Sequence, residues 1–286
     1  MNLDLTNIAA DADKLDGLDS TAFAKLNGDS DQRFKIAAAV NLDEALAKGQ
    51  FNQTFYVDAT NGDDNNDGSN AHPFKTLKKA CDSVPIGGHG SIQLAQNQTY
   101  FIDSDIYISN KVILIRAENS IIENTAYVFT YNGTDYTATY GFLPIMSRIM
   151  FLHGTIRTAN LLTDNSGSVI PTFVVQGIIK RNSIVRAFVQ TYDTNIELGD
   201  TDFIRIANDG NAVDLFMNTG SVNRVGANQD GYLIRNDSGD FRFSAHGTSL
   251  ATERDGTTNL TWNSIISGIV KDANGVPRNI ISNIVF

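Results

Sequence analysis

Short apolar runs separated by turn-forming residues fill the chain after Gly90 and restrict the folds open to it. Each run has only a few residues, rich in Ile, Val, Phe and Tyr, and is followed by Asn, Asp, Ser or Gly, which is the pattern of short strands. A strand this short buries its inner face only against neighbours, so several must stack. The sequence therefore predicts a mainly β protein. The predicted strands cover residues 91–94, 100–102, 106–108, 112–115, 121–122, 148–151, 172–175 and 184–189.

The composition excludes several classes of protein. The chain has 286 residues, 42% of them hydrophobic, which is enough for a sizeable core. A formal net charge of −10 argues against a nucleic-acid partner, which requires a basic face. Apolar runs are too short for membrane insertion, and Met1-Asn-Leu-Asp lacks the basic start of a signal peptide. The single cysteine, Cys81, excludes an internal disulfide framework and any multi-cysteine metal site.

The stretch 55–84 joins a short strand, a loop rich in Gly, Asp and Asn, and a helix. Phe74, Leu77, Cys81 and Val84 form one apolar stripe at helical spacing, with Pro73 at the helix start. The spacing predicts an amphipathic helix over 73–84.

The loop within that stretch contains part of a calcium-binding pattern. Asp63, Asn65 and Asp67, followed by Gly68, match the first half of an EF-hand loop, but Phe74 occupies the twelfth position, where a bidentate Glu should stand. The alternative is a series of Asx turns that satisfy their own backbone. The prediction is that no metal and no cofactor binds, with these three residues as the weak metal candidates.

The order of strand, loop and Pro-Phe-x-Thr-Leu-x-x-Ala helix, written here as YVDATNGDDNNDGSNAHPFKTLKKA, resembles the entry module of right-handed parallel β-helix proteins of the pectate-lyase-like and phage-tailspike kind. The resemblance implies that the helix covers the open apolar end of the β-helix. The preceding ADADKLDGLDSTAFAKL and FKIAAAVNLDEALAKGQF resemble linker-like repeats of bacteriophage tail fibres. Neither resemblance transfers catalytic residues.

We accordingly expect three regions. Residues 1–54 form an attachment or trimerisation segment with short helices, one of them starting at the capping box Asn41–Glu44. Residues 55–192 form the right-handed parallel β-helix. Residues 193–286 carry a Gly- or Asn-based turn roughly every 8 to 12 residues, which is the rhythm of an antiparallel sandwich or meander. They are predicted to form a C-terminal antiparallel β domain.

A hairpin is predicted around Asn132-Gly133, a pair that favours a type I′ turn. This turn sets Tyr131 opposite Thr134 and Phe129 opposite Tyr136. Four aromatic side chains then share one face and could form a platform for sugar rings; the alternative is packing against the solenoid or another subunit. The four are Tyr127, Phe129, Tyr131 and Tyr136.

Candidates for catalysis are few. The chain has no nucleophile elbow, HExxH motif, Walker loop or dinucleotide fingerprint. Glycan cleavage requires two carboxylates at suitable separation, and the pairs Asp103 with Asp105 and Asp200 with Asp202 would meet that requirement if each shared a strand face. Such pairs also cap turns at strand ends. Arginines in the C-terminal part could bind anionic glycans or merely flank solvent; they are Arg205, Arg224, Arg235, Arg242 and Arg254.

The resemblance implies a tail-fibre or tailspike protein of the virion, made in the host cytoplasm, that attaches to bacterial surface polysaccharide. Its implied partners are two further copies of itself in a homotrimer and the phage tail or an upstream fibre protein. The alternatives are a tailspike depolymerase, acting as a glycosidase or lyase on capsule or lipopolysaccharide, and a structural connector with no ligand.

Overall fold

The computed structural model describes residues 14–15, 18–19, 52–172, 177–181, 186–207 and 212–286. The chain divides into two units, Met1–Lys48 and Gly49–Phe286. In the first unit the described residues form two short antiparallel strands, β1 (Lys14–Leu15) and β2 (Leu18–Asp19). The helices predicted there lie outside the described residues, as do positions 173–175 and 184–185 of the predicted strands.

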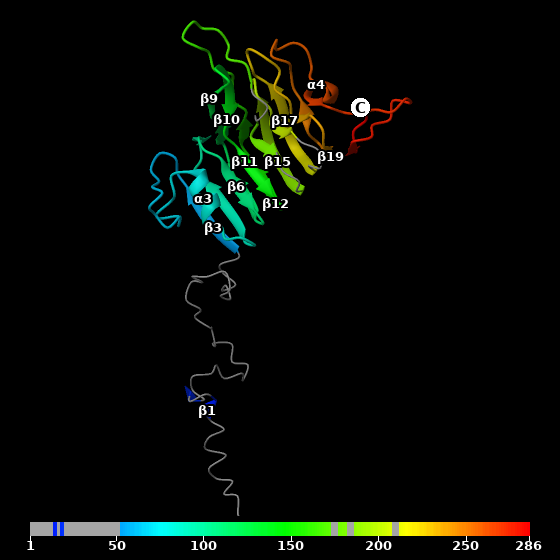
Figure 1. The fold of residues 1–286 in the computed structure, drawn as a ribbon. Helices are drawn as coiled ribbons and strands as arrows, with labels where there is room; N and C mark the ends of the chain where they lie inside the picture. Colours follow the sequence, from blue (N-terminus) through cyan, green and yellow to red (C-terminus); the bar gives the residue numbers. More distant parts are fainter. Residues whose placement is uncertain (1–13, 16–17, 20–51, 173–176, 182–185, 208–211) are drawn as a thin grey trace, which may run out of the picture. The chain divides into compact units, whose positions relative to one another are not determined.

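The second unit is mainly β, and its main sheets are parallel. One sheet runs in the order β22-β19-β17-β15-β12-β7-β4-β3, and another in the order β21-β18-β16-β14-β11-β6. Figure 1 shows the strands of these sheets lying side by side, and we call this arrangement the stack. The first sheet comprises β3 (Asn52–Val57), β4 (His89–Leu94), β7 (Val112–Arg116), β12 (Ser147–Leu152), β15 (Arg186–Leu198), β17 (Ala212–Arg224), β19 (Asp240–His246) and β22 (Ile280–Ser282). The second comprises β6 (Ile106–Ser109), β11 (Phe142–Ile145), β14 (Ile179–Arg181), β16 (Ile204–Ile206), β18 (Ile234–Asn236) and β21 (Ile266–Ser267).

Along the chain, a short strand follows a strand of the first sheet and precedes a strand of the second sheet, and these short strands form a third row. The long strands β15 and β17 enter it with their C-terminal halves, where β15 pairs with β13 and β17 pairs with β20. Every named pair in the row is parallel. The shorter members are β5 (Thr99–Ile102), β8 (Ile121–Asn124), β13 (Thr155–Arg157) and β20 (Ser249–Leu250). Each turn of the chain thus contributes strands to the three rows, and these strands pair with the strands of the same row from the previous turn.

The core is formed by the side chains on the inward-facing side of each row of strands. In the sheet that contains β6, the register aligns Ile106, Phe142 and Ile179, and continues through Ile204 to Ile234. All five side chains are buried. Similar apolar residues stack at the same register position in successive turns, and this stacking stabilises the short strands.

The helix α3 (Leu77–Ser83) covers the start of this core. Thr76 is its N-cap and accepts a hydrogen bond from the backbone N–H of Lys79. The carboxylate of Asp64 accepts bonds from the N–H groups of Lys75 and Thr76, each at 2.9 Å, which ties the preceding loop to the helix start. The helix contacts β3, β4, β5 and β6, and the predicted apolar stripe is buried. The helix begins at Leu77 and not at the predicted Pro73, because Phe74 pairs with Val57 in a β-bridge before it.

The antiparallel character expected for residues 193–286 is only weakly present. Among the described residues, it is limited there to isolated bridges, Thr252 with Asn259 and Lys271 with Pro277. The named strands in that part pair in parallel with the strands before them. The predicted border at 192–193 falls inside β15. Turn spacing alone misled the interpretation, because a stack of parallel strands with tight corners has the same turn rhythm as a meander.

Candidate functional site

The hairpin is formed by β9 (Ala126–Tyr131) and β10 (Thr134–Thr139), between β8 and β11. Its register confirms the prediction, with Tyr131 opposite Thr134 and Phe129 opposite Tyr136. Asn132 has φ of 48° and Gly133 has φ of 76°, the two positive values that a type I′ turn requires. The local sequence decides this turn, because glycine adopts positive φ without a steric penalty.

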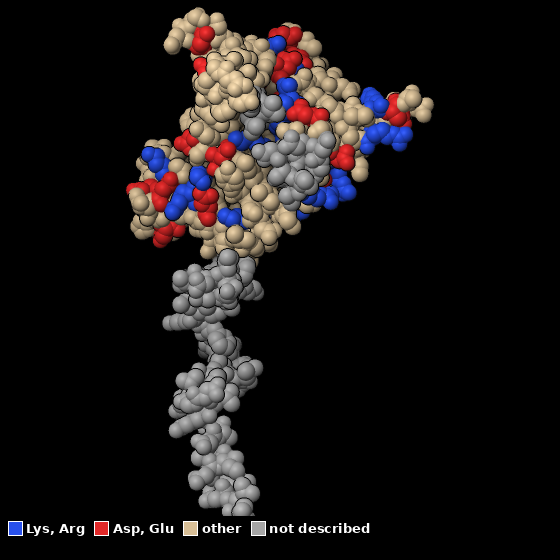
Figure 2. Space-filling view, in the orientation of Figure 1, with Lys and Arg blue, Asp and Glu red and all other residues tan. Residues whose placement is uncertain are grey.

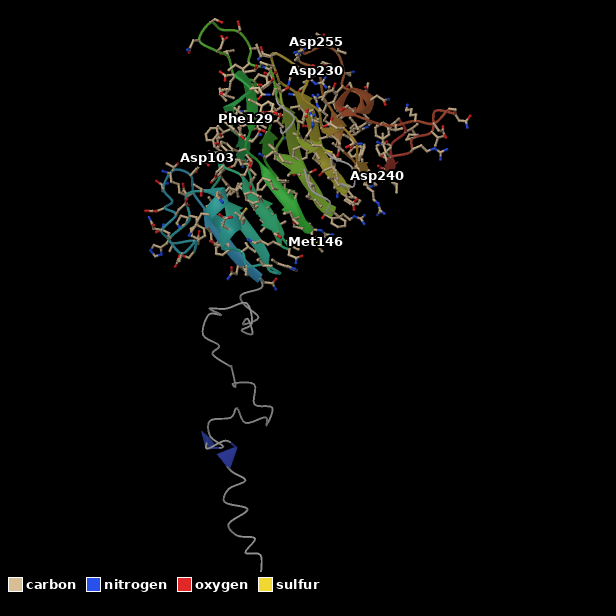
Figure 3. The ribbon with its side chains drawn as sticks, in the orientation of Figure 1. Asp103, Phe129, Met146, Asp230, Asp240 and Asp255 are labelled. Carbon is tan, nitrogen blue, oxygen red and sulfur yellow. The ribbon has the colours of Figure 1, made fainter. Side chains whose placement is uncertain are left out.

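The aromatic side chains of the hairpin differ in exposure. Phe129 and Tyr131 are 38% and 50% exposed, with nearly parallel rings whose centroids are 6.5 Å apart. Tyr127 is half-buried and stacks on Tyr140 at 4.4 Å. Figure 3 labels Phe129 on the hairpin. The predicted aromatic face therefore exists, with its outer part open to solvent and its base joined to the stack.

The carboxylates of Asp103 and Asp105 lie in the connection between β5 and β6, not on a strand. Asp103 is exposed. Asp105 pairs with Lys180 at 2.5 Å and accepts a hydrogen bond from the N–H of Gly141 at 3.0 Å. The structure gives these two groups different surroundings and no shared face.

Asp200 and Asp202 lie in the connection between β15 and β16 and are fully buried. The carboxylate of Asp200 accepts hydrogen bonds from the backbone N–H groups of Leu161 and Asn228 and from the Asn228 side chain. Burial raises the pKa of Asp200, but these hydrogen bonds outweigh it and hold the pKa below its usual value. Its oxygens serve as loop anchors, which leaves little capacity for acid–base chemistry.

The Asp202 carboxylate lies between two guanidinium groups. Arg235 Nε is 2.9 Å away and Arg205 Nη1 is 3.2 Å away, and the other oxygen accepts the N–H of Tyr232. Arg235 also lies over the Tyr232 ring at 4.4 Å. Two of the arginines that sequence reasoning left open thus hold a buried carboxylate and do not flank solvent.

The loop pattern that suggested calcium forms Asx turns. Asp63 accepts from the backbone and side chain of Asn65, and Asp67 accepts from the N–H of Ser69. Gly68 takes φ of 77°. Among the described residues, no group of three His, Cys, Asp or Glu side chains is arranged to hold a metal ion.

A polar cleft of about 510 Å³ near α4 (Trp262–Ile265) was not expected from the sequence. We call it the Arg224 cleft; Arg224, Asp230, Glu253 and Arg254 line it together with Tyr232. The buried Arg224 guanidinium donates to Glu253 and lies 3.8 Å from Asp230, which also pairs with Arg254 at 3.4 Å. Figure 2 shows the mixture of blue and red atoms in the upper part of the folded unit, where Figure 3 labels Asp230 and Asp255.

The Arg224 cleft offers hydrogen-bond donors and acceptors side by side, which suits a ligand rich in hydroxyl groups. Both carboxylates of the cleft are engaged by arginine, whereas glycoside hydrolysis requires a pair of carboxyl groups that flank the scissile bond. The arrangement therefore favours binding over cleavage. The residues come from β17, from the connection before β18 and from the loop after β20, so spacing in the sequence could not reveal the site.

The comparisons with known proteins supply no further identification. Models of protein families, curated proteins and solved structures were compared with the chain, and none matches it. No helix in the described part of the chain is both long and apolar enough to cross a membrane.

Proposed function

We propose that the second unit is a right-handed parallel β-helix that begins at β3 and continues beyond residue 192. In support, each named strand of the three rows pairs in parallel with its counterpart in the previous turn of the chain, as β7 does with β4 and β12 with β7. Parallel crossovers are right-handed in nearly all proteins, which gives the hand. The cover that α3 provides over the first turn agrees with the role expected for it.

On this scaffold we propose a phage tail-fibre or tailspike protein that attaches the virion tail to bacterial surface glycan. The observation that carries the binding function is the hairpin, whose outer aromatic side chains, Phe129 and Tyr131, are 38% and 50% exposed. Aromatic rings provide flat apolar area, and the tyrosine hydroxyl adds a hydrogen-bonding group, a combination that suits sugar rings.

The placement on a virion tail follows from the resemblance of segments 10–26, 34–51 and 56–80 to phage fibres and tailspikes. The same resemblance carries the proposed partners, the tail or an upstream fibre protein. It also carries the proposed homotrimer, in which a cyclic arrangement closes on itself. Light scattering of the full chain should then give a mass near three times 31.1 kDa.

Binding of whole bacterial cells by the full chain tests the attachment function. The double variant Phe129→Ala, Tyr131→Ala should bind at least about tenfold more weakly, because each stacked ring contributes about 1 kcal/mol or more. Tyr107→Ala is the matched control, since Tyr107 is 59% exposed and lies on β6, which is not part of the hairpin. Both variants should keep the parent's mass and Tm. If the hairpin variant binds cells as tightly as the parent, the hairpin is not the binding site.

A depolymerase is the second candidate, because Asp230 and Glu253 lie close enough to face the same Arg224 nitrogen. Incubation with purified surface polysaccharide, followed by sizing of the glycan and assay of reducing ends, distinguishes the two functions. Attachment alone leaves the polymer length unchanged. If the Glu253→Gln variant still shortens the polymer, catalysis takes place at another site. A chain that binds neither cells nor glycan would be a structural connector.

A further inference from the structure

A second open cleft, of about 540 Å³, lies where β7, β12 and β15 begin. We call it the Arg148 cleft. The register aligns Val112, Arg148 and Phe188 across the three strands, so their side chains point outward side by side. The corners before the strands form the rest of its wall, including Asn110 and Met146, both with positive φ. Figure 3 labels Met146 at the lower edge of the strands.

The charge of the Arg148 cleft is opposite to that of the chain. Among the residues that the structure describes, Lys111, Arg148 and Arg186 line it and no carboxylate does, although the formal net charge of the chain is −10. Arg186 is compensated, because it pairs with the buried Asp214 at 2.6 Å. Within the described ranges, neither Lys111 nor Arg148 has a carboxylate within ion-pairing distance; the ammonium of Lys111, only 9% exposed, donates to the carbonyl of Cys81 at 3.1 Å.

The ring of Phe188 holds two of these cations in place. The guanidinium carbons of Arg148 and Arg186 lie 5.5 Å and 5.0 Å from its centroid, within the range of cation–π attraction. Stacking fixes guanidinium orientation before a ligand arrives, so less side-chain entropy is lost on binding. A guanidinium fork matches the two oxygens of a carboxylate, and the ring beside it offers apolar area.

We propose that the Arg148 cleft binds a uronic acid unit of an acidic glycan, with its carboxylate against Arg148 and its pyranose ring against Phe188. This inference rests on the proposed glycan-binding function and adds the charge class of the sugar. The Arg224 cleft, whose carboxylates offset its arginines, is then the site for neutral hydroxyl-rich units.

Calorimetric titration of the full chain with sodium glucuronate tests the proposal, with glucose as the neutral analogue and sodium sulfate as the bare anion. We expect glucuronate to bind more tightly than either. Arg148→Gln should weaken glucuronate binding about tenfold or more, the usual effect of losing a hydrogen bond to a charged group. Arg116→Gln is the matched control, because Arg116 also faces outward on β7 and forms no ion pair with the described residues. It should change the affinity less than about twofold.

Several outcomes would overturn the proposal. Absence of glucuronate binding, or an equal loss in both variants, would show that Arg148 forms no specific site. Sulfate binding as tight as glucuronate binding would remove the sugar from the inference. Whole-cell binding separates this failure from failure of the proposed function. A parent chain that binds cells but not glucuronate contradicts only the uronate site, whereas a parent chain that binds no cells contradicts the attachment function itself.

Discussion

The apolar face of α3 and the connection between β15 and β16 are both buried, but different forces bury them. At α3, the side chains of Leu77, Cys81 and Val84 leave water without forming polar interactions of their own. In the connection, Asp200 and Asp202 are buried as carboxylates and take hydrogen bonds or ion pairs from distant parts of the chain. One region is held by removal of apolar area from water, and the other by hydrogen bonds and ion pairs to buried carboxylates. These partners outweigh burial at Asp200, whose pKa is lowered, but not at Asp202, where burial raises the pKa despite Arg235 and Arg205.

The difference sets what each region can tolerate. Apolar burial is non-directional, so a swap that conserves volume changes little. A buried carboxylate has already given up its hydration and depends on every partner, so removal of either side is costly. The two regions should therefore respond differently to substitution and to pH.

The largest effect is expected for Leu77→Asp, which places a charge against the apolar end with no partner. We expect a loss of about 4 kcal/mol or more in the free energy of unfolding, whereas Leu77→Met should lose less than about 1.5 kcal/mol. Chemical denaturation measures both. Burial raises the pKa of Cys81 to about 12, so its thiol should resist labelling in the parent chain and react readily in the aspartate variant. A protected thiol in a stable Leu77→Asp protein would contradict the role of α3 as a cover.

Asp200→Ala should have the next largest effect. It removes the charged acceptor of the Leu161 and Asn228 N–H groups, and we expect a loss of about 3 kcal/mol. Asp200→Asn keeps one acceptor oxygen and should lose less. A Tm equal to that of the parent in the alanine variant would show that the connection is not held by this carboxylate.

The local sequence predicted the features that depend on neighbouring residues. The apolar spacing around Leu77 and Cys81 predicted the helix, though not its start, and Asn132-Gly133 specifies its turn, because the deciding contacts are with near neighbours. The short apolar runs between turn residues likewise located strands such as β4, β7 and β12.

Features decided by distant residues could not be predicted in the same way. From the sequence, Asp200 and Asp202 were expected to share one strand face. Their partners lie far along the chain, and those of Asp200 include Asn228 and Leu161, the latter 39 residues away. Arg224 read as one scattered arginine, yet it is buried between Glu253 and the carbonyl of Ser264. The clefts form only when successive turns of the chain stack, so no spacing within one segment announces them.

Acid should separate the two regions further. The pKa of Asp200 is lowered in the folded chain, so its stabilisation is fully present above the ordinary value of 3.8 and is lost as the pH falls below it, through the lowered folded pKa. Between about pH 6 and about pH 3, the parent should therefore lose more unfolding free energy than Asp200→Asn, whose side chain does not titrate. Leu77→Met should follow the parent. Parallel curves for the parent and Asp200→Asn would exclude the linkage.

The smallest effect is expected for a charge pair on the α3 side of the comparison. Lys78 and Asp82 lie 2.6 Å apart on the outer face of the helix, but their side chains are 38% and 44% exposed. Solvent screens such a pair, and ordering two side chains offsets the attraction, so the pair should contribute only about 0.3 to 0.5 kcal/mol. A double-mutant cycle with Lys78→Gln and Asp82→Asn measures it, and added salt should reduce it further. A coupling energy as large as the loss in Asp200→Ala would mean that distance, and not burial, determines what a charge contributes here, and the contrast between the two regions would fail.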